Sequence, residues 1–524
     1  MKYGNSLYVA KRKHSPDSKV VKIRTDKSLG GLKTFIVCAV ILSQLAILIA
    51  LYIWLGLAFQ WYLVFSFAMS LVTCIYVLSS KRNGLSKCVW IMLLLLGFCF
   101  GYIVYFLSDE RFFFRKAKKK YREIYGRADR YTELSVPEQA TPCVRRDCNY
   151  LWNAGKFQAY RNTRVTYFSS GASLFDDVLS RIERAETFIF IEFFIVSDGV
   201  LLNRTFDLLQ EKVKKGVDVR IIYDDMGSHG TFSSAMKKKI KGAGIKLQPF
   251  NRLLPRFSVA LNFRDHRKLV IVDGKTAYTG GSNLADEYVN EKRMYGYWKD
   301  TGIRLDGQAV DGFSLIFLRQ WEFLTGQSED YARFFGRSEP YASQSVVVPY
   351  ADGLDFALPI GKNVYENIIS GANERLWIMT PYFVPDDTVI NLLINRATAG
   401  VDVRIVLPGV PDKAFVYAVS RNNAEKLIEH GVKVYCMKNA FVHSKIVLSE
   451  NCCVVGSINV DLRSFYQQFE SAVYTDDASV SAQVNEDFER VFLCSERITW
   501  ENGKRKYRIN RIFAGIMQIF APFM

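Results

Sequence analysis

The strongest constraint on the fold is a hexapeptide that occurs twice, Gly-Val-Asp-Val-Arg-Ile at residues 216–221 and again at 400–405. A helical pattern precedes each copy, and each copy continues into a strand pattern. Short β-rich runs alternate with amphipathic helical patterns throughout this part of the chain. The sequence therefore predicts an α/β fold made of two homologous halves, residues 151–339 and 340–500, related by a pseudo-two-fold axis.

Charged and apolar residues are segregated along the chain. Lys and Arg total 69 against 52 Asp and Glu, a formal net charge of +17. Even so, no charged residue lies between Thr34 and Ser80 or between Cys88 and Ser108. About 20 apolar residues are enough to cross a bilayer, so the composition excludes a purely soluble protein. We expect transmembrane helices within residues 34–107, at 34–59, 61–79 and 88–107.

The basic residues lie beside the apolar segments, where they favour anionic lipid headgroups. A nucleic-acid-binding protein would carry its basic surface on the folded domain, but residues 131–500 have a net charge of −2. The predicted partners are therefore the bilayer and anionic membrane lipids, and not nucleic acid. The basic stretches are a cytoplasmic N-terminus (1–33), a loop at 81–87, a juxtamembrane linker (108–150) and an amphipathic C-terminal tail (501–524).

The orientation of the membrane segments is left open by the sequence. Three spans would place residues 108–130 outside, against the positive-inside rule. Either one segment is re-entrant or the rule fails here. We expect the catalytic part on the cytoplasmic side, because the three basic clusters beside the apolar segments, 1–33, 81–87 and 108–130, all prefer it. For residues 511–524 we expect a helix at the membrane interface, the alternative being a helix packed on the core of the domain.

Each half also carries a His-x-Lys pair followed by a return strand with a small turn and an amide. Strand alternation puts the imidazole and the ammonium of each pair on one face. Asp273-Gly274 predicts a hairpin turn after the first pair. The pairs are His266–Lys268 and His443–Lys445, and the return strands end in Gly-Gly-Ser-Asn at 280–283 and Gly-Ser-Ile-Asn at 456–459.

This set of side chains predicts chemistry on a phosphodiester. Two lysines and two amides can hold phosphoryl oxygens, one imidazole can attack phosphorus, and the other can protonate the leaving oxygen. No metal-ligand spacing occurs, so we expect neither a metal nor a cofactor. Asp224-Asp225 could form a magnesium site, but structural or substrate-positioning roles are favoured. The ten cysteines show no disulfide framework.

At these residues the sequence resembles the phospholipase D superfamily, whose pattern is His-x-Lys-x4-Asp followed by Gly-Ser-x-Asn or a close variant. His266, Lys268, Asp273 and Asn283 fit this pattern. Further segments resemble bacterial cardiolipin synthases, among them Tyr223–Ser228, Asp265–Lys268, Thr279–Asn283, Trp298–Thr301, Thr380–Pro385 and Asp461–Phe465. The resemblance implies a sandwich fold with the active site between the halves, in a multi-pass protein of a bacterial cytoplasmic membrane. It also implies transfer of a phosphatidyl group between two phosphatidylglycerol molecules, giving cardiolipin and glycerol.

Roles for the site residues follow from this resemblance and from the paired motifs. We expect His266 to be the nucleophile that forms a phosphatidyl-histidine, and His443 to act as acid and then base. By position, Asp300 is expected to orient His266 and Glu470 to orient His443. The remaining expected site residues are Lys268, Lys445, Asn283, Asn459, Ser282 and Ser457 around the phosphoryl group, and Asp273 and Glu450 as the last catalytic residues of the two motifs.

The second motif departs from the family pattern. Glu450 stands where Asp is expected, and the return strand reaches its glycine one residue early. The longer carboxylate could compensate for the shorter turn, or Glu450 could lie outside the site.

Three other functions remain as alternatives. The motif sets the phosphoryl chemistry but hardly the acceptor, so a phospholipase D-type hydrolase or a transferase with another alcohol is the main one. A metal-independent nuclease and a non-catalytic membrane scaffold rank lower. The oligomeric state is not specified by the sequence.

Overall fold

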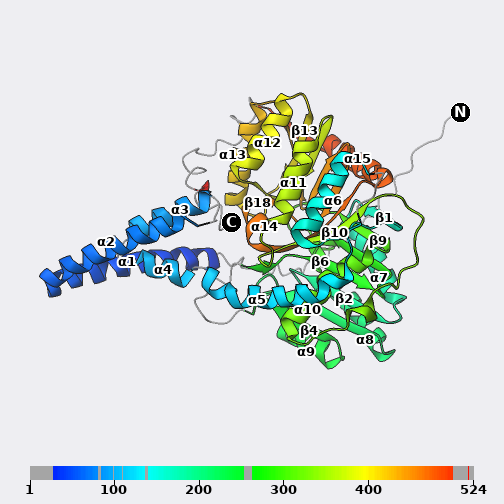
Figure 1. Ribbon diagram of the computed structural model, residues 1–524, viewed down its shortest axis with the longest axis horizontal. Coiled ribbons are helices and arrows are strands. Elements are labelled where there is room, and N and C mark those ends of the chain that lie inside the picture. Colours follow the sequence, from blue (N-terminus) through cyan, green and yellow to red (C-terminus); the bar gives the residue numbers. More distant parts are fainter. Residues whose placement is uncertain are drawn as a thin grey trace, which may run out of the picture. The chain divides into compact units, whose positions relative to one another are not determined.

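The computed structural model describes residues 28–80, 84–97, 100–108, 110–135, 140–252, 263–499 and 517–518 (Figure 1). Most of the predicted basic N-terminus and of the predicted C-terminal tail therefore lies outside the described residues. The chain divides into two compact units. One is Met1–Arg82 with Trp90–Tyr105, and the other is Asn83–Val89 with Phe106–Met524.

The first unit consists of apolar helices. They are α1 (Ser28–Leu55), α2 (Leu57–Leu78), α3 (Gly84–Leu96) and α4 (Gly101–Ser108). Gly56, with φ of 43°, separates α1 from α2. Within the described residues one helical stretch, Ala58–Leu78, is long and apolar enough to cross a membrane, and the apolar stretches Leu42–Trp54 and Ser86–Leu96 are shorter.

The surface of α2 is apolar where it is exposed and contains small polar residues where it is buried. Trp61 is 74% exposed, whereas Ser66 and Ser70 are buried. The Thr73 hydroxyl is also buried and donates to the Met69 carbonyl (2.7 Å). Small polar residues between helices and large apolar residues outside are typical of helices in lipid, so this distribution supports the predicted membrane segment.

The predicted single span over 88–107 is wrong. This segment forms α3 and α4, and the Trp90 ring packs edge-on against the Tyr105 ring with centroids 5.0 Å apart. In one continuous helix these residues would be about 22 Å apart along the axis. Helices α3 and α4 therefore fold back on each other, and a Cβ on Gly101 would lie 3.1 Å from the Leu94 Cα. Hydropathy alone gives no signal for this reversal.

The second unit contains two sheets with the same strand order. The first is β1 (Thr163–Phe168), β9 (Gly302–Gly307), β7 (Thr276–Gly280), β6 (Lys268–Val272), β2 (Phe188–Phe193), β3 (Asp218–Asp224) and β4 (Lys246–Phe250). The second is β10 (Val347–Asp352), β19 (Gln468–Thr475), β17 (Cys453–Gly456), β16 (Ile446–Ser449), β11 (Arg375–Met379), β13 (Asp402–Pro408), β14 (Lys433–Met437) and β20 (Ser495–Ile498). Apart from the added β20, the two orders correspond strand for strand, which confirms the predicted pair of α/β halves. The repeated hexapeptide leads into β3 and β13, which are equivalent strands.

Helices cover the sheets (Figure 1). In the first half they are α7 (Gly171–Glu183), α8 (Val200–Lys214), α9 (Ser234–Gly242), α10 (Val310–Thr325) and the 3-10 helices η3 (Asp286–Val289) and η4 (Tyr331–Phe334). In the second half they are α11 (Ile360–Gly371), α12 (Asp387–Thr398), α13 (Ala414–Ile428), α14 (Leu462–Tyr466) and α15 (Ala478–Leu493).

Residues 108–150 are more than the linker that the sequence suggests. They form α5 (Glu110–Ala128), the 3-10 helix η1 (Asp129–Tyr131) and the start of α6 (Pro142–Gly155). Tyr121 of α5 stacks on Phe323 of α10, with ring centroids 3.9 Å apart. Val144 and Leu151 of α6 are buried in the same hydrophobic core. This region is therefore part of the α/β unit.

Short strands join the two halves to each other. β5 (Arg264–Asp265) pairs in parallel with β19, and β8 (Tyr297–Lys299) pairs in parallel with β15 (Ala440–Val442). A further short pair links β12 (Phe383–Val384) with β18 (Val460–Asp461) inside the second half. The two pairs between halves end directly before the two motif histidines.

Candidate active site

The first motif histidine is positioned by a strand of the other half. β5 pairs with β19 so that Asp265 lies opposite Phe469, and the His266 amide donates to the Phe469 carbonyl (2.8 Å). One residue further along both strands, His266 Nδ1 lies 2.9 Å from the Glu470 carboxylate. The carboxylate that orients His266 therefore comes from the second half.

The second histidine is positioned in the equivalent way, by a strand of the first half. β15 pairs with β8 so that Val442 lies opposite Lys299, and the His443 amide donates to the Lys299 carbonyl (2.7 Å). His443 Nδ1 then lies 2.8 Å from Asp300 Oδ2. The predicted pairing of Asp300 with His266 and Glu470 with His443 is wrong. Because strands of the two halves pair with each other, each histidine contacts a carboxylate of the other half.

Glycine makes the approach of Asp300 possible. A Cβ on Gly281 would lie 2.1 Å from Asp300 Oδ1 and 2.8 Å from the His443 carbonyl oxygen. Any side chain at this position would therefore push the carboxylate away from the imidazole. The second glycine of the Gly-Gly-Ser-Asn turn is thus required by the contact between halves.

Glu470 is held by two serines. Ser457 and Ser464 both donate hydroxyl hydrogen bonds to its carboxylate, Ser464 at 2.7 Å. Asp300 is held by one backbone amide, that of Thr301 (2.8 Å). Ser457 was predicted near the phosphoryl group, and the structure instead places its hydroxyl on the carboxylate behind the imidazole.

Both imidazoles are buried among positive charges. Burial lowers the pKa of His266 well below its ordinary value, and Lys268 and Lys445 lower it further. For His443, burial and then Lys445 lower the pKa to about 4, although Asp300 opposes this. Each imidazole is therefore neutral near pH 7. A carboxylate that accepts the Nδ1 hydrogen leaves the Nε2 lone pair available.

The two motif lysines are also buried. Burial lowers the pKa of Lys268 to about 7 and that of Lys445 to about 8, and the neighbouring carboxylates Glu470 and Asp300 oppose the shift. Each ammonium donates to the carbonyl of its own motif histidine. The negative charge of an entering phosphodiester would favour the protonated form of both lysines.

The histidines and the motif amides line one cavity of about 260 Å³ between the two halves. His266, His443, Asn283 and Asn459 all contribute to its wall. Asn283 is fixed, because its Oδ1 accepts from the Ile195 amide (3.0 Å) and its Nδ2 donates to the Tyr288 hydroxyl (2.7 Å). Asn459 Oδ1 is buried without a hydrogen-bond partner. These predicted site residues are therefore brought together.

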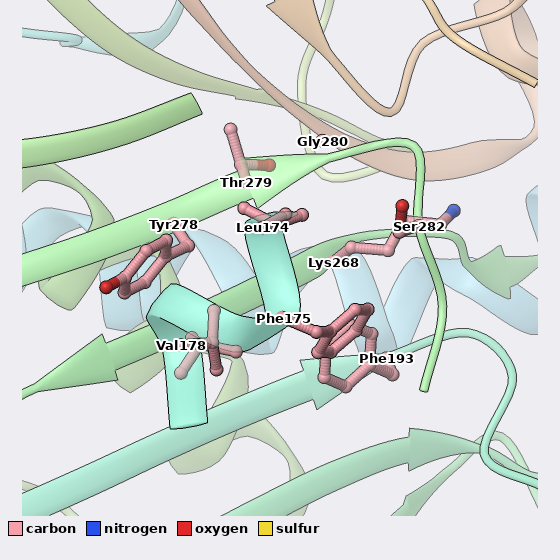
Figure 2. A pocket seen from close by; sticks show the side chains of 10 residues that line it. Leu174, Phe175, Val178, Phe193, Lys268, Tyr278, Thr279, Gly280 and Ser282 are labelled. Carbon is pink, nitrogen blue, oxygen red and sulfur yellow. The ribbon is translucent and has the colours of Figure 1, made fainter. Parts of the chain in front are cut away.

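A second, much smaller cavity of about 10 Å³ lies within the first half (Figure 2). Lys268 and Ser282 lie beside the apolar side chains of Leu174, Phe175 and Phe193 there (Figure 2). The Ser282 hydroxyl is buried without a hydrogen-bond partner. This space is at the lower limit for one water molecule, and it surrounds the stem of Lys268 with apolar side chains.

Comparisons with known proteins agree with this arrangement. The family described as "Cardiolipin synthase, PLD-like domain" matches residues 178–294 and 365–492, one segment in each half. An uncharacterized protein of Streptococcus mutans is 32% identical over 86% of this chain and 99% of its own length. A cardiolipin synthase of Geobacillus kaustophilus is 32% identical over 69% of this chain and 72% of its own length. This chain belongs to the cardiolipin synthase family.

More distant relatives extend the comparison. Cardiolipin synthase 2 of Bacillus cereus is 29% identical over 88% of this chain and 91% of its own length. The crystal structure of phosphatidylserine synthase from Haemophilus influenzae is 14% identical, with a TM-score of 0.55 over 72% of this chain and 97% of that chain. The second comparison shows a shared fold.

The motif carboxylates Asp273 and Glu450 lie at the far end of the motif strands in this member of the cardiolipin synthase family. Asp273 accepts backbone hydrogen bonds from Glu186, Thr187 and Phe188, at 2.6–3.0 Å. Glu450 accepts from the amides of Asn373 (2.8 Å) and Arg375 (3.4 Å).

Both carboxylates thus cap the start of the neighbouring strand, β2 or β11. Strand β6 alone separates Asp273 from Lys268 by about 16 Å. The predicted catalytic roles of Asp273 and Glu450 are therefore replaced by structural ones. Asp273 and Gly274 have φ of 55° and 66°, which fits the predicted hairpin turn.

The sequence interpretation missed several residues of the cavity wall. They include Arg463, whose charge also lowers the pKa of His266, and the aromatic residues Phe194, Tyr288, Trp298 and Tyr382. Some of these lie in the segments that resemble the family, Trp298–Thr301, Thr380–Pro385 and Asp461–Phe465. Those segments were a usable signal. Asp224 accepts from the Asp265 amide (3.0 Å) and lies 3.4 Å from Arg264, so of the structural and substrate-positioning roles that the sequence left open it has a structural one.

Proposed function

We propose that this enzyme is a membrane-bound phosphatidyltransferase that makes cardiolipin and glycerol from two phosphatidylglycerol molecules through a phosphatidyl-histidine. One observation carries the proposal. Two imidazoles, each held at Nδ1 by a buried carboxylate, line a single cavity beside two buried lysines. Two-step transfer needs this set, because one imidazole must bond to phosphorus while the other moves protons.

In the first step His266 Nε2 attacks phosphorus and the bond from phosphorus to the glycerol oxygen breaks. Protonated His443 gives its Nε2 proton to that oxygen, so glycerol leaves as a neutral alcohol. The incoming phosphodiester supplies the negative charge that raises the pKa of His443 from its value of about 4. Lys268 and Lys445 balance the charge that develops on the phosphoryl oxygens.

In the second step a hydroxyl of another phosphatidylglycerol attacks the phosphorus. Neutral His443 accepts the proton of that hydroxyl, the P–N bond breaks, and His266 is released with cardiolipin. One feature supports the division of roles. The carboxylate of His266 is held by two serines, whereas that of His443 is held by one amide.

The product assay tests the reaction. Purified protein in phosphatidylglycerol vesicles, with chelator present, is expected to give cardiolipin and glycerol in equal amounts. Phosphatidic acid as the main product would support the hydrolase alternative. Transfer to other alcohols in preference to phosphatidylglycerol would support a different transferase.

The division of labour between the histidines has its own test. The reaction is quenched during turnover without acid, and the modified peptide is mapped. We expect the phosphatidyl group on the peptide that contains His266. A phosphatidyl group on the His443 peptide would reverse the assignment.

The membrane arrangement is part of the proposal. We infer that α1 and α2 cross the bilayer and that the α3–α4 hairpin enters and leaves on one side. The basic residues before α3 and those of α5 then lie on the same face as the N-terminus, which satisfies the positive-inside rule. Single cysteines introduced at Ser86 and Arg130 are expected to be protected from an impermeant reagent in intact cells and labelled after lysis. Labelling of Arg130→Cys alone in intact cells would contradict the hairpin.

A further inference from the structure

The two ends of the active-site cavity differ in chemistry. Near His266 the wall includes Arg463, Gln468 and the ring of Phe194, whose centroid lies 5.0 Å from that of the imidazole. Near His443 the wall is aromatic, with Tyr288, Trp298 and Phe441 centroids 5.3, 5.6 and 5.8 Å from the imidazole. The reaction described above uses none of these aromatic rings.

Three carboxylates also line this cavity, and Lys413 lies in its wall next to one of them, Asp412. Asp461 caps α14, where it accepts from the Ser464 amide (2.7 Å), and the other two come from different halves. Glu287 belongs to η3 of the first half, and Asp412 lies between β13 and α13 of the second half. Both lie close to the same two tyrosines. Their negative charges therefore raise the pKa of Tyr288 and of Tyr295. The Tyr382 hydroxyl donates to Asp412 and fixes its side chain. Both carboxylates are half-buried, so their remaining lone pairs can meet a ligand.

The reacting phosphoryl group fits between the histidines, beside Lys268 and Lys445, and not against these carboxylates, since like charges repel. What a carboxylate binds well is a hydroxyl that donates to it, and an aromatic ring can cover the CH groups of the same ligand. Two further polar atoms of the cavity wall, Trp298 Nε1 and Asn459 Oδ1, are buried without hydrogen-bond partners.

We propose that Glu287, Asp412 and the surrounding aromatic rings form a polyol subsite that binds the hydroxyls of a glycerol headgroup beside His443. The subsite rests on the proposed function and explains how one cavity serves both of its steps. The leaving group of the first step is glycerol, and the acceptor of the second step is also a glycerol headgroup. Each places one oxygen next to His443, and each has a further hydroxyl for the carboxylates. The same subsite therefore binds the departing glycerol and then the incoming one.

Selectivity against water and simple alcohols follows. A buried acceptor left without its donor costs binding free energy, so a site built for hydroxyls discriminates against ligands that lack them. Glycerol fills both carboxylate contacts, whereas 1-propanol has the same carbon chain but only the reacting hydroxyl. We expect the enzyme to prefer glycerol over 1-propanol by roughly 10- to 100-fold.

The test separates the two steps by using a phosphatidyl donor whose headgroup is not glycerol. A phosphatidyl ester of p-nitrophenol releases nitrophenol without needing the subsite, and glycerol and 1-propanol then compete for the phosphatidyl group. The full-length protein and the variants Asp412→Asn, Glu287→Gln and Tyr382→Phe are compared in detergent micelles. Glu291→Gln is the matched control, since Glu291 is exposed and outside the cavity wall.

The expected result is a selective loss. Nitrophenol release stays within about 3-fold in all variants, while the glycerol preference of Asp412→Asn and Glu287→Gln falls about 10-fold or more and that of Glu291→Gln is unchanged. An unchanged preference in both carboxylate variants would overturn the subsite. Loss of nitrophenol release in folded variants would place the carboxylates in the phosphoryl-transfer machinery and would overturn it as well. Wild-type protein that releases nitrophenol but forms only phosphatidic acid would instead refute the proposed transferase function.

Discussion

Lys268 and Lys445 are the motif residues that titrate near neutral pH. Their pKa values of about 7 and about 8 mean that they lose protons as the pH rises through this range. Because kcat/KM reports the free enzyme, we expect it to fall between about pH 7 and 9. A bound phosphodiester raises both pKa values, so kcat should fall only at higher pH. Initial rates across pH 6–10 measure both curves, and a flat kcat/KM up to pH 10 would contradict this prediction.

Asp273 gives a residue-scale test of structural against catalytic roles. Burial raises its pKa, but the hydrogen bonds from the amides of Thr187, Glu186 and Phe188 outweigh burial and lower it overall. A carboxylate with a lowered folded-state pKa stabilises the fold above its unfolded pKa of about 3.9, and this stability is lost as the pH falls through the folded pKa.

We therefore expect Asp273→Asn to lower the free energy of unfolding by about 1–3 kcal/mol at pH 7 with little change in kcat. Thermal unfolding and the product assay measure the two effects. Glu450→Gln, which loses one short and one long amide contact, should cost less. A 1000-fold loss of kcat in a fully stable Asp273→Asn protein would restore the catalytic role.

The residues that sequence reasoning placed well are those that carry their own chemistry. His266, His443, Asn283 and Asn459 all line the cavity as expected. The orienting carboxylates were the right residues with the wrong partners. Sequence order assigns Asp300 to the nearer histidine, whereas strand pairing between halves assigns it to His443, and no local pattern reports that pairing.

At the scale of elements, α5 packs against the part of the α/β unit that positions His266. Tyr121 stacks on Phe323 and donates to Gln320 Oε1 (3.0 Å). Its ring also lies 5.8 Å from that of Phe469, the residue whose carbonyl accepts the His266 amide. The helix thus supports the strand that positions His266 and its carboxylate.

We expect Tyr121→Ala to cost about 3–5 kcal/mol of stability and to lower kcat about 10- to 100-fold, because a small displacement of the reacting groups is costly. Tyr121→Phe keeps the stacking and should cost about 1 kcal/mol with near-normal kcat. Unfolding curves and rates measured at a temperature where both variants are folded distinguish the effects. Normal kcat in a folded Tyr121→Ala protein would show that α5 only anchors the domain.

Elements were predicted well where a repeating pattern specified them. The duplicated hexapeptide identified equivalent strands, β3 and β13, and with them the two halves. The α3–α4 reversal and the packing of α5 were not predictable in the same way. Both depend on contacts with other elements, such as Trp90 with Tyr105, rather than on the hydropathy of the segment itself.

At the scale of the whole molecule, each histidine contacts a carboxylate of the other half. These contacts predict how each carboxylate affects the first step of the reaction. Glu470 contacts His266, the proposed nucleophile, and Asp300 contacts His443, the proposed general acid. A nitrophenol leaving group needs no proton. We therefore expect Asp300→Asn to recover most of its first-step rate with the nitrophenyl donor, while Glu470→Gln stays slow with both donors. Stopped-flow bursts measure this step, and equal recovery in both variants would contradict the cross-half assignment.

These contacts between the halves also bear on how such a chain could arise. A protein with only one of these halves would hold a histidine without its carboxylate, and would be inert by itself. Two identical copies facing each other would complete both pairs at once, and such a protein would work only as a homodimer. Joining the copies in one polypeptide makes activity independent of protein concentration. It also allows the two histidines to differ, a freedom that identical subunits cannot have.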